Sequence, residues 1–302
     1  MIGPFLDFKK NPVLMPGSGF DSKGAFNPAV IREGDNYLML YRAESLEDSL
    51  TGRIGLARSR DGFRFVKHPE PVIVPDKDFD RFGCEDPRLV KIGDTYYLTY
   101  VSNCGRYERG NICLATSRTL MHWEKHGTTR KPQKDWDRGQ VKAGAILPEQ
   151  IDGKYIMYFM GEKEPWKTAI GIAYSNDLVS WYEPLDQPVL LPRKGYFDSQ
   201  GVEPGPPPLL TEKGIWLIYC GWAEDCVYKV GAALFSKDDP YRVLERSEKP
   251  ILTPAKNWGE FFGGISNHAV AEGLVKDGNR WLLYYGAADR ACCLAIWVEN
   301  IW

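Results

Sequence analysis

One pattern, a glycine turn followed by an alternating, aromatic-rich run, occurs five times along the chain. Residues 34–41 read Gly-Asp-Asn-Tyr-Leu-Met-Leu-Tyr, and residues 93–100 read Gly-Asp-Thr-Tyr-Tyr-Leu-Thr-Tyr. The glycines that open the five copies are spaced by 59, 60, 61 and 64 residues: Gly34, Gly93, Gly153, Gly214 and Gly278. Turn formers in front of alternating, aromatic residues are typical of β-strands. The regular period therefore predicts five copies of one multi-stranded unit.

Two further elements recur with the same period. A short apolar strand follows each aromatic run, as at residues 53–57 (Arg-Ile-Gly-Leu-Ala) and 111–115 (Asn-Ile-Cys-Leu-Ala). A third element has proline near both ends of a short apolar run, and it occurs at residues 11–16, 70–75, 187–192 and 249–254, with a degenerate copy near Lys131. Proline has no N–H group to donate, so this element suits the outer edge of a sheet.

The positions of this third element predict how the units close. Another period beyond Pro250 would fall past Trp302, whereas one copy, at residues 11–16, precedes the first unit. The N-terminal copy can therefore supply the outer strand that the last unit lacks, which is how a β-propeller closes its ring. A sandwich or a solenoid does not explain this complementarity. The sequence predicts a single all-β domain over residues 1–302, a five-bladed β-propeller with four-stranded blades.

Composition excludes several classes of function. The chain has 302 residues, 43% of them hydrophobic, and a formal net charge of −2. No block of like charge stands out, so we expect neither nucleic acid nor a membrane surface as a partner. The seven cysteines lack metal-ligand spacing and the N-terminus lacks a signal-peptide core. We expect reduced thiols, a cytoplasmic location, and no metal or cofactor. The oligomeric state is left open.

Polar residues interrupt the strand that precedes each glycine turn. In a propeller this first strand lines the central channel, where pockets form. The residues that the five strands would bring to the axis are Asn27, Glu85, Asp86, Arg88, Glu149, Glu203, His268 and Glu272. A single carboxylate of this kind more often caps a turn or pairs with arginine, but several buried together are costly unless they are functional.

Several carboxylates around one pocket indicate chemistry on sugars. An inverting glycosidase needs a protonated acid and a carboxylate base, roughly 6.5–9.5 Å apart, with water between them. The chain has no apparent Ser-His-Asp order, phosphate-binding glycine loop or HExxH motif, which makes other hydrolase and nucleotide-binding classes less suitable.

The chain resembles glycoside hydrolase family 130, which contains β-mannoside phosphorylases and β-1,2-mannosidases. The most specific segments are residues 41–43 (Tyr-Arg-Ala), 53–57, 83–88 (Gly-Cys-Glu-Asp-Pro-Arg), 205–208 (Gly-Pro-Pro-Pro) and 284–289 (Tyr-Tyr-Gly-Ala-Ala-Asp). The resemblance covers nearly the whole chain. It implies a five-bladed fold, in agreement with the repeat count, and a β-mannoside substrate.

The resemblance also implies roles for individual residues. Asp86 would be the general acid, passing its proton through a hydroxyl of the sugar that is released. Asn27, Arg42 and Asp289 match positions that hold the terminal mannose, although Arg42 could instead pair with Asp86 and Asp289 could be a turn residue. Arg88 and His268, on inner strands, are further candidate substrate-binding residues.

The attacking group separates the two activities of the family. Phosphorylases need cationic or hydrogen-bonding groups to hold phosphate. Their pattern has a histidine after the Ile-Tyr of the fourth unit and a lysine before the Gly-Pro-Pro segment, where this chain has Cys220 and Gln200 or Gly201. Glu203 and Glu272 would repel phosphate and could activate water. We expect an inverting, exo-acting β-1,2-mannosidase, with one of these glutamates as the base and the other orienting water or sugar.

Two alternatives stay open. The first is a β-mannoside phosphorylase that uses inorganic phosphate as co-substrate and releases α-mannose 1-phosphate, with Lys142, Arg106 and Arg109 replacing the lost cations. The second is a non-catalytic sugar-binding propeller. The loops at residues 44–52, 103–110 and 162–167 are expected to shape selectivity.

Overall fold

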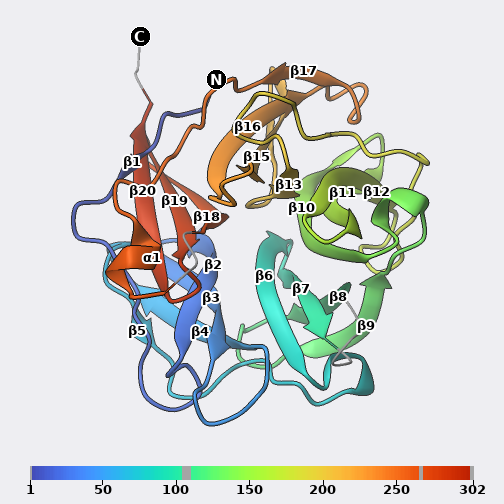
Figure 1. Ribbon diagram of the computed structural model, residues 1–302. Coiled ribbons are helices and arrows are strands. Elements are labelled where there is room, and N and C mark those ends of the chain that lie inside the picture. The colour runs from blue at the N-terminus through green and yellow to red at the C-terminus, as the bar shows by residue number, and fades with distance from the viewer. Residues whose placement is uncertain (1, 104–109, 265–267, 300–302) are drawn as a thin grey trace.

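Five antiparallel sheets surround a central axis in the computed structural model, which describes residues 2–103, 110–264 and 268–299 (Figure 1). The predicted five-bladed β-propeller is confirmed. In each sheet the strand nearest the axis precedes the glycine turn, and the aromatic-rich strand follows as its neighbour. No helix among the described residues is long and apolar enough to cross a membrane.

Within each of the first three blades, successive strands lie side by side, and each lies farther from the axis than the one before it. Blade 1 contains β2 (Gly24–Glu33), β3 (Asn36–Glu44), β4 (Arg53–Ser59) and β5 (Val66–Lys67). Blade 2 contains β6 (Gly83–Ile92), β7 (Thr95–Asn103), β8 (Asn111–Ser117) and β9 (Glu124–Arg130). Blade 3 contains β10 (Gln140–Ile151), β11 (Lys154–Glu164) and β12 (Lys167–Ser175). Short 3-10 helices at Asp78–Asp80 and Asp135–Asp137 lead into blades 2 and 3.

The last two blades complete the ring. Blade 4 contains β13 (Gly201–Pro204), β14 (Leu209–Thr211), β15 (Gly214–Trp222), β16 (Lys229–Phe235) and β17 (Val243–Arg246). Blade 5 contains β18 (Ala269–Asp277), β19 (Arg280–Ala287), β20 (Ala291–Val298) and β1 (Leu6–Asp7). A four-residue helix, α1 (Trp258–Phe261), precedes β18, and its first residue is buried while Phe261 is exposed.

The N-terminal segment is the outer strand of blade 5, as predicted. Leu6 and Asp7 pair with Ile296 and Ala295 of β20, and Leu14 forms an isolated bridge to Cys292. The proline-flanked elements of blades 1, 3 and 4 also pair by single bridges, at Ile73, Leu190 and Leu252. Because proline cannot donate to a ladder, these elements form short outer edges instead of full strands. Blade 3 accordingly has three strands and isolated bridges in the outer position.

A buried aspartate anchors the segment that leads into each of four blades: Asp21, Asp80, Asp137 and Asp198. Asp80 accepts hydrogen bonds from Tyr100 Oη at 3.0 Å and Lys125 Nζ at 2.5 Å. These partners come from β7 and β9, so one carboxylate ties the lead-in segment to the second and outer strands of blade 2. In the sequence an aromatic residue immediately precedes each of these aspartates, a signal that the repeated glycine turns do not include.

Candidate active site

Irregularities in the inner strands aim polar side chains at the channel. The register of β2 shifts between Phe26 and Pro28, and that of β6 shifts between Glu85 and Arg88. Asn27 and Asp86 lie in these bulges with φ of 51° and 48°, in the left-handed region. Bulges re-aim side chains and are common beside active sites. Here they bring together equivalent residues of blades 1 and 2, which are 59 positions apart in sequence.

Asp86 is buried and held by two neighbours. Asn27 Nδ2 donates to Asp86 Oδ1 at 2.7 Å, and Arg42 Nη1 lies 3.1 Å from the same oxygen. Arg42 also pairs with Glu85 at 3.0 Å and with Glu44 at 2.8 Å. Arg42 therefore does pair with Asp86, and it is fixed in place by three carboxylates.

Arg88 lies beneath the channel and joins three blades. Its Nη1 is 2.7 Å from Glu272 Oε1, and its Nη2 is 3.5 Å from Glu203 Oε1. Its guanidinium also donates to the carbonyl oxygens of Gly205 at 2.8 Å and Pro204 at 3.0 Å. With four such partners and 2% exposure, Arg88 positions the carboxylates and does not reach toward solvent.

The two candidate bases differ in accessibility. Glu272 is completely buried behind Arg88. Glu203 is 7% exposed and lines a cavity of about 360 Å³ together with Lys142. Water or a small ligand can meet the carboxyl group of Glu203 without displacing the core, whereas Glu272 faces protein only.

Charges in the channel set the acidity of these groups. Four carboxyl groups (Glu85, Asp86, Glu203 and Glu272) face three cations (Arg42, Arg88 and Lys142). Burial raises the pKa of Glu203, and it raises that of Glu272 strongly, with Arg88 opposing the shift in both. Burial also disfavours the charged form of Asp86, but Arg42, Lys142 and Arg88 outweigh it and lower the pKa of Asp86 to about 2. The free protein therefore keeps Asp86 ionised at neutral pH.

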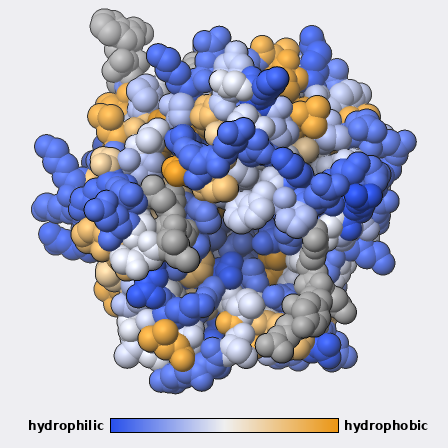
Figure 2. Space-filling model, viewed as in Figure 1, coloured by the Kyte–Doolittle hydropathy of each residue, from blue (hydrophilic) through white to orange (hydrophobic). Residues whose placement is uncertain are grey.

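Aromatic side chains border the cavity at Glu203, and His268 packs against two of them. Trp166, Trp222 and Tyr228 form part of its lining, and the Tyr228 ring lies 4.6 Å from that of His268. His268 Nδ1 in turn lies 3.5 Å from Asp289 Oδ2, in the turn between β19 and β20. Figure 2 shows a hollow in the middle of the ring with hydrophilic residues at its floor. The sequence-predicted His268 and Asp289 thus lie side by side, but the aromatic lining was not predicted.

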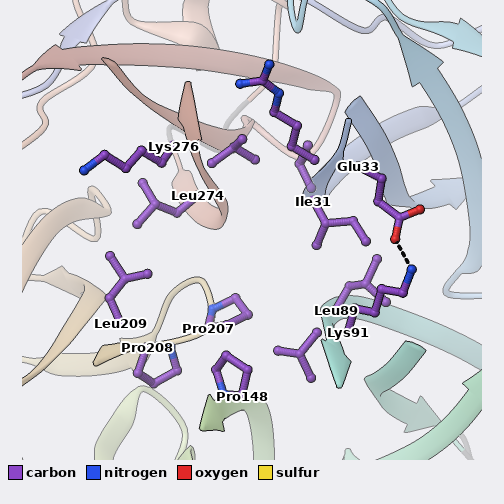
Figure 3. Close-up of a pocket in the computed structure, with 14 residues that line it drawn as sticks. Ile31, Glu33, Leu89, Lys91, Pro148, Pro207, Pro208, Leu209, Leu274 and Lys276 are labelled. Carbon is purple, nitrogen blue, oxygen red and sulfur yellow. Dashed lines mark hydrogen bonds and ion pairs between the residues drawn. The ribbon is translucent and has the colours of Figure 1, made fainter. Parts of the chain in front are cut away.

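Glu149 does not belong to this site, contrary to the sequence prediction. It is exposed near the far end of β10, next to Pro148. Pro148 lines a second, largely apolar cavity of about 370 Å³ between the far ends of the inner strands, with Pro207, Pro208 and Leu274 (Figure 3). The residues of the site lie toward the start of their inner strands. Glu149 lies near the end of β10, so its side chain is far along the strand from the site.

The remaining predicted cations divide into two groups. Lys142 lines the cavity at Glu203, and the carboxylates Glu85, Asp86 and Glu203 raise its pKa although burial opposes this. Arg106 and Arg109, and most of the loop at residues 103–110, lie outside the described residues. Lys142 therefore supplies one positive charge beside Asp86 and Glu203.

Buried carboxyl groups on the inner strands, one of them (Glu203) on the wall of a cavity large enough for a sugar ring, are the arrangement found in glycoside-processing enzymes. A family model described as beta-1,4-mannooligosaccharide phosphorylase matches residues 9–302. The chain belongs to glycoside hydrolase family 130, as the resemblance implied, and it is an enzyme that acts on glycosides.

Relatives of this chain are described in connection with β-mannoside phosphorolysis or hydrolysis. A 1,2-beta-oligomannan phosphorylase of Thermoanaerobacter sp. (strain X514) is 34% identical over 294 residues, 94% of each chain. A beta-1,2-mannobiose phosphorylase of the same strain is 33% identical, again over 94% of each chain. A solved family 130 structure, described with glycoside hydrolases that target beta-1,2 mannosidic linkages in Candida mannan, is 31% identical with a TM-score of 0.87. That match covers 99% of this chain and 94% of the other.

Proposed function

We propose that this enzyme hydrolyses β-1,2-linked mannosides and manno-oligosaccharides, acting from the chain end with inversion of configuration. The observation that carries the proposal is the placement of Glu203, a carboxyl group on the cavity wall with Arg88 at 3.5 Å behind it. A carboxylate at this position can accept a proton from water, whereas it repels a phosphate dianion.

The residues that stand where phosphorylases carry cations support the same choice. Cys220 is fully buried, and its Sγ accepts a hydrogen bond from the backbone N–H of Ala271 at 3.3 Å. Gln200 accepts from Lys167 Nζ at 2.8 Å, and Gly201 has no side chain. None of these three positions offers a positive charge to a phosphate ion in the cavity.

The reaction divides between two carboxyl groups. A water molecule attacks the anomeric carbon and gives a proton to the Glu203 carboxylate, while the glycosidic C–O bond breaks. Asp86 supplies a proton to the leaving oxygen, in the manner that the family resemblance implies, through a hydroxyl of the released sugar. Glu272 stays behind Arg88 and holds that guanidinium in place. The raised pKa of Glu203 makes it a stronger base than an exposed glutamate.

Asp86 must gain a proton before it can act as the acid. Its low pKa depends on Arg42, Lys142 and Arg88, and on the hydrogen bond from Asn27. A sugar hydroxyl that takes over Asn27 or Arg42 removes part of this stabilisation and raises the pKa of Asp86. Substrate binding and protonation of the acid are coupled in this mechanism.

Phosphorolysis is the second candidate, and two observations favour it. Lys142 places a positive charge in the cavity beside Glu203, and the relatives at 33–34% identity are phosphorylases. In this reaction a phosphate oxygen attacks the anomeric carbon and the product is α-mannose 1-phosphate. A non-catalytic sugar-binding role has no comparable support.

The two candidates are separated by phosphate dependence and by matched glutamate variants. We expect β-1,2-mannobiose to be cleaved at the same rate with and without inorganic phosphate. Glu203→Gln should lower kcat by about 10²–10⁴-fold, because the base is lost. Glu272→Gln, which removes a carboxyl group that substrate cannot reach, should retain far more activity. Phosphate-dependent turnover that survives in the Glu203→Gln variant would contradict hydrolysis.

The proposed reaction uses water and side chains of this chain, so we expect no metal or cofactor requirement. Treatment with EDTA should leave the rate unchanged. The cytoplasmic location remains a prediction from the sequence, which fractionation of the source cells would test.

A further inference from the structure

Trp166 stands at the rim of the cavity that contains Glu203. It lies in the two-residue turn between β11 and β12, where Glu164 pairs with Lys167. Half of its surface is exposed, although it is a large apolar side chain. It shares the cavity lining with Lys142 and Glu203, so its indole borders the space next to the proposed base.

The backbone of Trp166 is in a conformation that favours glycine. Its φ is 68°, and the preceding residue is Pro165. A proline followed by a left-handed residue is the pattern of a type II turn, in which glycine normally takes the second position. A tryptophan at this position costs conformational energy, and such strain is often retained where a site needs a particular side chain.

Trp166 rests on a wall of rings formed by Trp222, Tyr228 and His268. Its ring meets the edge of Trp222 at 6.2 Å with an interplanar angle of 86°, and it lies 6.3 Å from the ring of His268. Trp222 is stacked on Tyr228 at 4.4 Å. Trp222 lies against Gly201, where any side chain would collide with the indole. The wall therefore has little freedom to collapse into the cavity.

The wall also carries a donor that no described residue satisfies. Trp222 is 1% exposed and lines the cavity, and its Nε1 has no hydrogen-bond partner among the described residues. A buried N–H group without a partner is costly, so the fold retains an unsatisfied polar atom in this part of the site. Lys142 and Glu203 offer further polar partners around the same space.

These features match the two faces of a pyranose ring. A sugar presents C–H groups on one face, which pack on an aromatic ring, and hydroxyl groups at its edge, which bond to polar side chains. We propose that Trp166 is the platform on which a pyranose ring of the substrate stacks, with Lys142 and Glu203 as partners for its hydroxyl groups. Trp166 is thus a specificity-determining residue and takes no part in proton transfer. This inference rests on the proposed action on mannosides.

Two substitutions at position 166 test the platform. Trp166→Gly removes the ring and places in the turn a residue that tolerates a positive φ. Trp166→Phe keeps an aromatic ring. With β-1,2-mannobiose, we expect Trp166→Gly to raise KM about tenfold while Trp166→Phe stays within about threefold of the wild type. The unfolding temperature of Trp166→Gly should be unchanged or higher, because glycine relieves the backbone strain. Tyr241→Ala, at an aromatic residue of similar exposure outside the cavity, is the control and should not change KM.

The outcomes distinguish this inference from the proposed function. An unchanged KM in Trp166→Gly, with an active wild type, overturns the platform alone. A KM for Trp166→Phe as high as that for Trp166→Gly excludes stacking on an aromatic ring. A lower unfolding temperature for Trp166→Gly with unchanged KM would assign Trp166 a structural role. A wild-type enzyme that neither binds nor cleaves mannobiose overturns the proposed function and the platform with it.

Discussion

Asp86 and Glu203 are both buried carboxyl groups, yet their surroundings shift their acidities in opposite directions. Burial dominates at Glu203, whereas the cations Arg42, Lys142 and Arg88 dominate at Asp86. The group proposed as acid therefore has a lower pKa than the group proposed as base. The active form, with Asp86 protonated and Glu203 ionised, is a minor species in the free enzyme. Its abundance is highest between the two pKa values, falling at lower and at higher pH.

Replacing Lys142 by Met should move the pH profile of kcat/KM upward. Lys142 stabilises the ionised forms of Asp86 and Glu203, so its removal raises the pKa of both. The alkaline limb, which follows the higher pKa of Glu203, should shift to higher pH by about one unit. Lys163→Met, at an exposed lysine paired with Asp135, is the control. An alkaline limb that stays in place in Lys142→Met would contradict the assignment of Glu203.

Replacing Asp86 by Asn should separate binding from chemistry. The amide keeps the shape of the side chain but cannot donate a proton as an acid. We expect kcat to fall by about 10²–10⁴-fold, with binding of mannobiose retained in calorimetry. Turnover close to that of the wild type would show that Asp86 is not the acid.

Among the elements of the fold, the segment that leads into each blade depends on its buried aspartate. Asp80 is fully buried, and Lys125, its partner on β9, is almost as inaccessible. Removing a buried carboxylate leaves the groups that donate to it without that partner, which costs more than the interaction itself contributes. These aspartates therefore stabilise the blades without taking part in catalysis.

Asp80→Ala should lower the free energy of unfolding by about 3–5 kcal/mol. The loss includes the hydrogen bonds that Asp80 accepts from the Tyr100 hydroxyl, from Lys125 Nζ and from the backbone N–H groups of Asp76 and Lys77, although Lys125 keeps Asp76 as an ion-pair partner. Asp78→Ala, two residues earlier and exposed, should change it by less than about 0.5 kcal/mol. Urea unfolding followed by circular dichroism measures both. Equal effects of the two substitutions would refute a role for the buried carboxylate.

At the scale of the whole molecule, stability depends on closing the ring. Phe5 is 3% exposed and packs against Trp297, with ring centroids 6.0 Å apart. Its backbone N–H donates to the carbonyl oxygen of Ile251, which lies in the proline-flanked element of blade 4. The N-terminal segment thus contacts both blade 5 and the outer edge of blade 4. Because the site draws residues from several blades, opening the ring should disperse it.

Phe5→Ala should destabilise the protein by about 3–5 kcal/mol, since it leaves a cavity at the closure. Leu6→Ala is the matched control, because Leu6 is 73% exposed and its loss should have little effect. Activity and the β-sheet signal should disappear together in urea. Loss of activity well before the β-sheet signal would show that the site does not depend on ring closure.

The repeat period made the propeller and its closure predictable, because each blade repeats the same strand pattern. The accessibility of Glu203 and Glu272 was not predictable, because it depends on where Arg88 lies between three blades. Glu149 was misplaced because the repeat fixes the strand but not which half of the strand faces the site. Trp166 was missed because its contribution comes from a turn conformation that the sequence pattern does not reveal.

If Glu203 guides water to the anomeric carbon, the identity of the first product must reveal it. Cleavage of β-1,2-mannobiose in the presence of phosphate should be followed by proton NMR from the first turnover. We expect free mannose that is released at a rate independent of phosphate, initially as the α-anomer, and that mutarotates afterwards. Accumulation of α-mannose 1-phosphate, or initial release of the β-anomer, would contradict it.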